Sequence, residues 1–129
     1  LHAQQGNRFL ELISGLDFDV YLMNTGWVGG AEGTPHSKKV KIRHSSAIVQ
    51  GIAKQSINWK PDPTFGYELA LGVDGFSDDD RGLLAPKEYY EATSRGDEYE
   101  NIAESFKRER VAHLKKFPGT DERLIQAVS

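Results

Sequence analysis

The sequence predicts a mixed α/β fold, and three observations predict it. Apolar residues recur at helical spacing in several separate stretches. Lys38–Arg43 alternates charged with apolar residues, which is the two-residue period of a half-exposed strand. Short apolar runs bounded by glycine or proline indicate further strands between the helices. With 129 residues the chain has room for one modest core, so we expect a single domain over residues 1–129.

The first half of the chain predicts alternating helices and strands. A helical apolar stripe ends near Gly15, and Phe18–Met23 then predicts a mostly buried strand. After the strand Lys38–Arg43, a second helix is expected over Ser46–Gln55, with Ser45 or His44 as its cap. Two short strands follow, separated by a proline-rich breaker; they are Ile57–Trp59 and Phe65–Leu71, with Pro61–Asp62–Pro63 between them.

The second half changes character. Residues 72–84 are acidic, glycine-rich and aperiodic, so we expect a mobile surface loop. Its acidic triplet, Asp78–Asp80, lacks the spacing of a calcium-binding EF-hand loop, which favours a solvated loop. Pro86 suits the first position of a helix that continues to Thr93. A long amphipathic helix is expected over Asp97–Lys116, before a last helical turn near the C-terminus.

Composition excludes several classes of function. The net charge of −3 argues against nucleic-acid binding, and no apolar run approaches the ~20 residues of a membrane span. There is no cysteine, which excludes disulfides and thiolate metal sites and fits an intracellular protein. The four histidines are dispersed without the spacing of a zinc site. No signal-peptide pattern is present at the start of the sequence.

The segment Asp19–Gln50 carries the strongest functional signal. An apolar run leads into a glycine-rich loop, then into paired lysines and a helix start. Such an order suits a site for a phosphorylated ligand, because glycines let backbone N–H groups approach and cations attract phosphate. The phosphate loop G-x-x-x-x-G-K-[ST] is absent. Trp27 can stack on a base or fill core, and at least one of Lys38 and Lys39 should face water.

The same segment resembles the ATP-dependent phosphoenolpyruvate carboxykinases. Val20–Trp27 with Gly29–Gly30, Lys38–Val40 and Ser45–Ile48 are similar to three blocks of that family. Weaker similarity covers nearly the whole chain; it includes Leu1–His2, Pro63–Gly66 and Leu83–Lys87. The resemblance implies a C-terminal fragment of the family's nucleotide-binding domain. Its partners would be nucleotide and the remainder of the same enzyme, in the cytoplasm.

The family's reaction converts oxaloacetate and ATP to phosphoenolpyruvate, carbon dioxide and ADP in gluconeogenesis. The resemblance places the phosphate loop and the ligands of the Mg or Mn ion outside this chain, so we expect the chain alone to be inactive. It implies that Lys39, Val40 and Ser45 belong to the ATP site, with a basic residue at the Lys39 position contacting the nucleotide. The Ser45 hydroxyl can contact the adenine or ribose, and it can equally cap a helix.

Three departures from the family pattern leave an alternative open. Lys39, Ser46 and Lys87 stand where the family has arginine. Lysine cannot reproduce the bidentate geometry of a guanidinium, and serine removes the charge. The alternative is a divergent, non-catalytic domain used for protein–protein contact, whose glycine loop no longer binds nucleotide.

Overall fold

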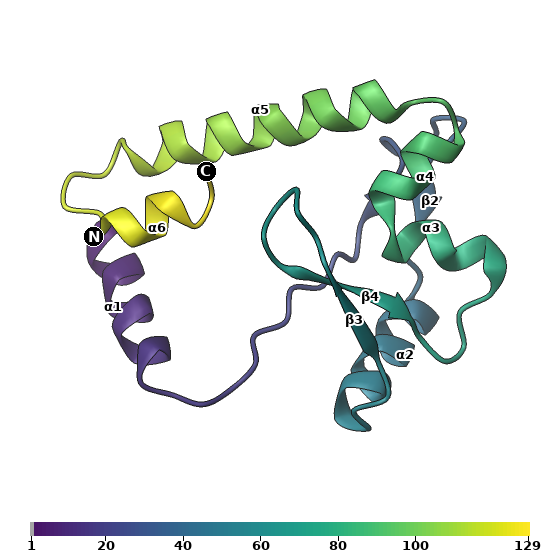
Figure 1. The fold of residues 1–129 in the computed structure, drawn as a ribbon, viewed down its shortest axis with the longest axis horizontal. Helices are drawn as coiled ribbons and strands as arrows, with labels where there is room; N and C mark the ends of the chain where they lie inside the picture. Colours follow the sequence, from purple (N-terminus) through teal and green to yellow (C-terminus); the bar gives the residue numbers. More distant parts are fainter. Residues whose placement is uncertain (1) are drawn as a thin grey trace. The chain divides into compact units, whose positions relative to one another are not determined.

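The computed structural model describes residues 2–129 and has the mixed α/β fold predicted from the sequence. Its contacts divide the chain into two compact units (Figure 1). One comprises the described residues up to Tyr21 together with Glu100–Ser129, and the other is Leu22–Tyr99. Leu1, part of the N-terminal block of the resemblance, lies outside the described residues. That residues 1–129 form a single domain stays a prediction.

The first unit is built from helices. It contains α1 (His2–Ser14), most of α5 (Gly96–Leu114) and the short α6 (Glu122–Gln126). The Asn7 side chain holds both sides of the turn before α6. Its amide donates to the carbonyl of Gly119 at 2.8 Å, and its oxygen accepts the N–H of Asp121 at 2.9 Å. Asp121 in turn caps α6, and hydrogen bonds from Arg123 lower the pKa of its carboxyl to about 2.

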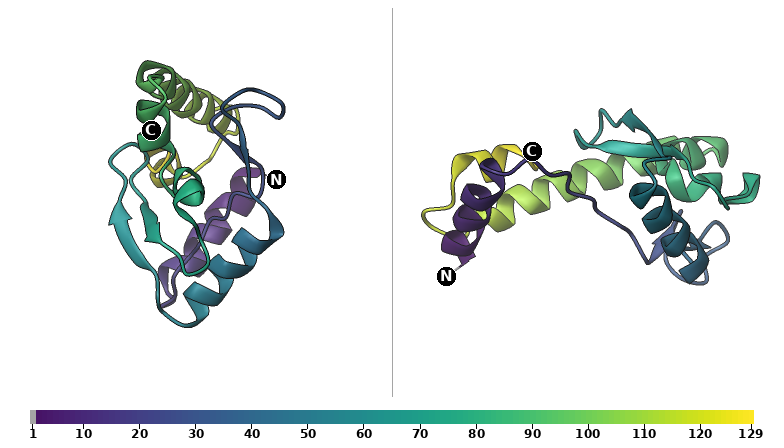
Figure 2. Two further views of the ribbon diagram at one scale, coloured as in Figure 1. Left: turned by 90° about the vertical axis from the view of Figure 1, so that its right-hand side faces the viewer. Right: turned by 90° about the horizontal axis from the view of Figure 1, so that it is seen from below.

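The second unit contains two antiparallel strand pairs and four helices (Figure 1 and Figure 2). In the first pair, β1 (Trp27–Val28) aligns Trp27 with Lys39 of β2 (Lys38–Lys39). The second pair is the hairpin of β3 (Asn58–Pro61) and β4 (Glu68–Gly72). The helices of this unit are the following: α2 (Ile42–Ala53), the 3-10 turn η1 (Asp78–Asp80), α3 (Arg81–Leu84) and α4 (Pro86–Ala92).

The core of the second unit is small. Its buried apolar side chains come from different parts of the unit, partly from elements and partly from the connections next to them: Val28, Val40, Ile57, Val73 and Tyr90. Gly51 lets α2 approach the start of the hairpin, because a Cβ at this position would lie 2.7 Å from Ile57. Asp62 and Pro63 of the predicted breaker lie in the turn of the hairpin, whereas Pro61 still belongs to β3 and pairs with Glu68. Asp62 is buried, and its carboxylate accepts the N–H of Thr64 at 3.0 Å.

The predicted N-terminal helix and the two longer helices predicted after residue 85 are confirmed. α1 carries the expected N-terminal stripe and ends at Ser14, one residue before Gly15. α4 begins at Pro86, and α5 matches the long amphipathic helix. Each of these segments contains its own apolar periodicity and stop signals, so its local pattern was sufficient to predict it.

The buried strand predicted over Phe18–Met23 is wrong. These residues have no regular secondary structure, and all six are exposed. A strand is stable only when its backbone groups pair with a neighbour, and no other described segment pairs with this one.

The strand predicted over Lys38–Arg43 is correct only for its first two residues. β2 ends at Lys39, and α2 begins at Ile42, where the prediction had a helix from Ser46. Ile42 is 86% exposed, so it does not follow Val40 into the core. The apparent two-residue alternation therefore arose because Ile42, an apolar residue at the start of a helix, happens to continue the pattern of the strand.

The prediction of an aperiodic loop over residues 72–84 is wrong for its second part. η1 and α3 occupy Asp78–Leu84, and Asp80 is buried. Gly72 belongs to β4. The mobility of the segment stays a prediction.

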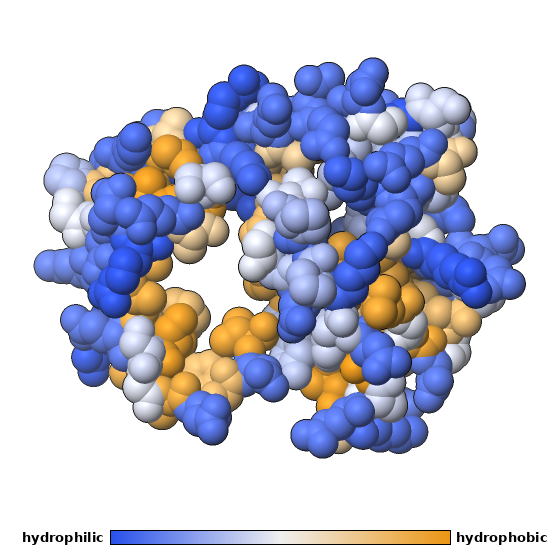
Figure 3. All heavy atoms as spheres, viewed as in Figure 1, coloured by the Kyte–Doolittle hydropathy of each residue, from blue (hydrophilic) through white to orange (hydrophobic). Residues whose placement is uncertain are grey.

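Both units expose large apolar side chains, which are visible as orange spheres in Figure 3. Leu22 is 87% exposed, and Phe9, Leu16 and Val20 are each more than half exposed. None of the helices among residues 2–129 has the length and apolar character needed to cross a membrane.

Candidate functional site

The glycine-rich loop between β1 and β2 is shaped by residues with positive φ. Three glycines of this loop have positive φ: 87° at Gly29, 150° at Gly30 and 80° at Gly33. Residues with a Cβ rarely adopt this backbone conformation. Gly29 is also closely packed. A Cβ there would lie 2.4 Å from the carbonyl oxygen of His36 and 2.5 Å from the ring of Tyr89.

Residues from α4 and the following turn hold this loop. The Tyr89 hydroxyl donates to the carbonyl of His36 at 2.8 Å. Arg95 donates from Nη1 to the carbonyl of Gly29 at 2.7 Å, and the same guanidinium pairs with Glu98 at 2.6 Å. The hydrogen bond from Arg95 is the main reason that the pKa of Glu98 is lowered. The space that the missing Cβ of Gly29 leaves is therefore filled by the Tyr89 ring of the same chain and does not serve a ligand.

Lys39 lies on the exposed side of the β1–β2 pair. Its ammonium is 5.2 Å from the centre of the Trp27 ring, within the range of a cation–π contact. None of the carboxylates among residues 2–129 forms an ion pair with it. Trp27 itself is half-buried. The prediction that one of the paired lysines faces water is therefore confirmed at Lys39.

Val40 follows in the chain but points into the core, with 8% of its surface exposed. Its N–H donates to the carbonyl of Gly26 at 3.0 Å, which extends the β1–β2 pairing by one bond. Its side chain fixes the backbone beside Lys39. Any direct contact with a ligand at this position would involve backbone atoms.

Ser45 lies inside α2, three residues after its first residue, so its predicted role as the helix cap is wrong. The alternative cap named from the sequence, His44, does serve the helix start. His44 Nδ1 accepts the backbone N–H of Lys41 at 3.0 Å. The Ser45 side chain is half-buried, and its contact with a nucleotide stays a prediction.

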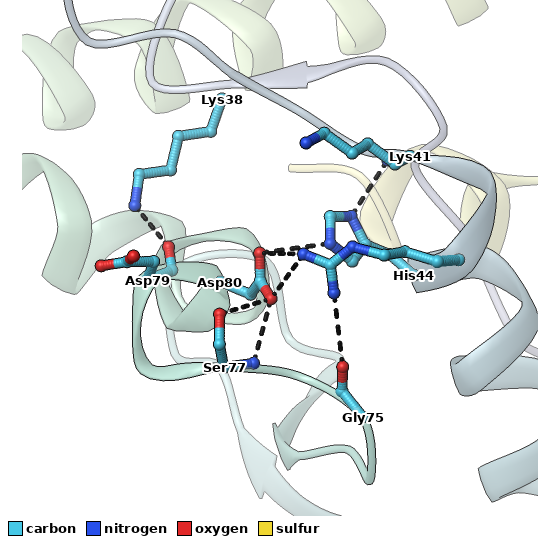
Figure 4. Close-up of polar contacts among 8 residues, drawn as sticks. Lys38, Lys41, His44, Gly75, Ser77, Asp79 and Asp80 are labelled. Carbon is cyan, nitrogen blue, oxygen red and sulfur yellow. Dashed lines mark hydrogen bonds and ion pairs between the residues drawn. The ribbon is translucent and has the colours of Figure 1, made fainter.

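A charged cluster joins the start of α2 to η1 (Figure 4). Arg43 Nη2 lies 2.9 and 2.8 Å from the two carboxylate oxygens of Asp80, and Nη1 donates to the carbonyl of Gly75. Ser77 donates to Asp80 Oδ2 from its backbone N–H at 3.0 Å and from its hydroxyl at 2.7 Å. These bonds, those from Ser77 above all, hold the pKa of the Asp80 carboxyl well below its usual range.

His44 completes the cluster and is 2% exposed. Since its Nδ1 accepts a hydrogen bond from Lys41, the ring proton is assigned to Nε2. Nε2 lies 3.2 Å from Asp80 Oδ1, an ion-pair distance without the alignment of a hydrogen bond. The ring also packs against Phe76 at 5.0 Å between centroids.

The sequence interpretation missed this cluster. Asp80 was assigned to a solvated loop and Arg43 to a strand, and the two are 37 residues apart. One local signal was available. Ser77 and Asp80 have the S-x-x-D spacing of a capping box, in which the acidic side chain bonds back to the first backbone N–H.

No group of three or more potential metal ligands occurs within residues 2–129. The divalent metal of the resemblance therefore has no such ligand set in this part of the chain.

Comparison with known proteins identifies the family. The family model described as phosphoenolpyruvate carboxykinase matches residues 1–79. The chain belongs to the ATP-dependent phosphoenolpyruvate carboxykinase family. It is 36% identical over 91 residues to the phosphoenolpyruvate carboxykinase (ATP) of Chelativorans sp. (strain BNC1), which is 67% of this chain and 17% of that protein.

Two further relatives match more of the chain. The phosphoenolpyruvate carboxykinase (ATP) of Rhizobium leguminosarum bv. trifolii is 31% identical over 122 residues, 91% of this chain. That of Allorhizobium ampelinum is 29% identical over 117 residues, 89% of this chain. These matches cover 21% and 20% of the two relatives, so the chain spans about a fifth of their length.

Proposed function

We propose that this chain is the C-terminal portion of the nucleotide-binding domain of an ATP-dependent phosphoenolpyruvate carboxykinase and forms the base-and-ribose end of its ATP pocket. Membership of the family supports the parent activity. The order of the motifs from Val20 to Ile48 supports the place of the chain within the domain. The parent enzyme would convert oxaloacetate and ATP to phosphoenolpyruvate, carbon dioxide and ADP, in the cytoplasm and in gluconeogenesis.

The observation that supports the proposal most strongly is that the Lys39 ammonium is oriented by Trp27 but is not paired with a carboxylate of residues 2–129. Of the four cations between residues 38 and 43, Arg43 is paired with Asp80, and Lys38 donates to the carbonyl of Asp79. Neither Lys39 nor Lys41 has a carboxylate partner within residues 2–129. Of these two, only the Lys39 ammonium is held over an aromatic ring in this part of the chain, that of Trp27, and it lies beside the buried Val40. A cation that is oriented but not neutralised by the protein is suited to an anionic or hydroxyl-bearing ligand.

The chemistry in this proposal is divided between the chain and the remainder of the enzyme. Phosphoryl transfer depends on positioning and on stabilising charge, which the phosphate loop and a Mg or Mn ion would supply outside these residues. The residues of this chain orient the nucleoside end of ATP. Ser45, half-buried in α2, is the second candidate contact.

Substitution of Lys39 tests the proposal. In the full-length enzyme, Lys39→Ala should weaken ATP binding by about 1–3 kcal/mol, the range for losing a hydrogen bond to a charged group, and should leave folding unchanged. Lys54→Ala is the matched control, because Lys54 is an exposed lysine at the far end of α2. Calorimetric titration with ATP measures both variants. Equal affinities in the two variants would contradict the proposal.

The exposed apolar side chains favour a second candidate function, that of a non-catalytic domain for protein–protein contact. Val20 and Leu22 are 61% and 87% exposed. This candidate predicts no saturable ATP binding by the full-length protein. The same titration therefore separates the two functions.

A further inference from the structure

We propose that Asp80 is a positioning residue for the ATP site, because its carboxylate fixes the start of α2 and hence the backbone that presents Lys39. The inference rests on the proposed function. It adds a residue far from the candidate contacts in sequence, outside all three blocks of the family resemblance.

The turn at residues 77–80 contacts the chain both before and after Lys39. Before Lys39, the Lys38 ammonium donates to the backbone carbonyl of Asp79. After it, Arg43 and His44 both approach the Asp80 carboxylate (Figure 4). Only four residues, from 39 to 42, lie between these two attachment points.

The Asp80 carboxylate is itself immobilised and charged. It is 8% exposed, and Ser77 donates to it twice from the same turn. The low pKa that follows keeps it ionised at neutral pH. A fixed negative charge beside Nε2 of His44 favours the ring orientation in which Nδ1 faces the backbone of Lys41.

A short series of interactions therefore connects Asp80 with the backbone next to Lys39, the candidate nucleotide contact. Asp80 orients His44, and His44 accepts the N–H of Lys41, two residues after Lys39. The His44 ring also packs against the ring of Phe76. Loss of the carboxylate should release this backbone, and displacements of about 1 Å at a binding site are enough to change its performance strongly.

The decisive experiment compares two aspartates of one triplet in the full-length enzyme. Asp80→Ala should raise the KM for ATP at least tenfold and leave kcat within twofold, since nucleotide positioning is lost and the reacting groups are not touched. Asp78→Ala is the control, because within residues 2–129 Asp78 forms an ion pair with Arg81 alone and both side chains are largely exposed. That variant should change neither constant by more than twofold.

A purely structural role for Asp80 predicts a different result. Partial unfolding would lower the apparent kcat in proportion to the folded fraction and leave KM unchanged, which would overturn the proposal. If Asp80→Ala does not fold, Asp80→Asn keeps the size of the side chain and removes its charge. The folded Asn variant should still raise KM several-fold, and an unchanged KM would refute the inference.

Measuring Lys39→Ala alongside separates this inference from the proposed function. If Lys39→Ala weakens ATP binding and Asp80→Ala does not, the ATP site stands and the positioning role is wrong. If neither variant changes ATP affinity, the proposed function itself fails.

Discussion

Replacing Gly29 by alanine should open the β1–β2 pair, and Gly33→Ala provides a control with the same backbone requirement. Both glycines have positive φ, of 87° and 80°, so each substitution introduces strain of about 1–3 kcal/mol. Only at Gly29 does the new Cβ also meet the carbonyl of His36 and the ring of Tyr89; at Gly33 nothing lies within 4 Å. Overpacking of this kind costs about a further 1–3 kcal/mol.

Amide hydrogen exchange of Val40 in the full-length protein measures the effect locally, because its N–H is held by the carbonyl of Gly26. The extra cost at Gly29 corresponds to about five- to 150-fold faster exchange than in Gly33→Ala. Exchange rates within twofold of each other would show that the loop is not packed against Tyr89 in solution, and the argument from close approach would be wrong.

Two further predictions follow from the site. Because the phosphate loop and metal ligands are proposed to lie elsewhere, the 129-residue chain mixed with oxaloacetate, ATP and magnesium or manganese should form no phosphoenolpyruvate, and turnover dependent on this chain alone would refute that placement. The second concerns pH. The folded-state pKa of Asp80 lies below its ordinary value, so the stability it contributes is present above about pH 4 and is lost as pH falls towards the folded pKa. The stability difference between the parent and Asp80→Asn should therefore be constant near neutral pH and shrink below about pH 4; a difference that grows with acid would contradict the assignment.

The sequence correctly predicted the elements whose start signal, apolar face and stop signal all lie within the element itself. α4 and α5 contain a start signal, an apolar face and a stop signal, and all of these are local. Phe18–Met23 has the composition of a strand, but a strand also needs a pairing neighbour, which local composition cannot supply. The start of α2 was misplaced because Ile42 continues the alternation of β2 while lying on the exposed first turn of a helix.

The residues of the candidate site also fall into those that the sequence predicted and those that it did not. Lys39 was singled out by the family resemblance, and it lies exposed on its strand, where the alternation predicted that at least one of the paired lysines faces water. Asp80 was missed because its partners, Arg43 and His44, are more than thirty residues away in sequence. Apart from the capping-box spacing of Ser77 and Asp80, only the three-dimensional structure distinguishes this carboxylate from the exposed Asp78 and Asp79 beside it.

Photolabelling of the full-length protein with 8-azido-ATP locates the adenine site, since the azide on the adenine reacts with whatever surrounds the base. If this chain forms the base-and-ribose end of the pocket, labelled peptides should lie within residues 26–46, the segment that carries Lys39 and Ser45, and excess ATP should suppress the label. Saturable labelling confined to peptides outside this segment would contradict this assignment.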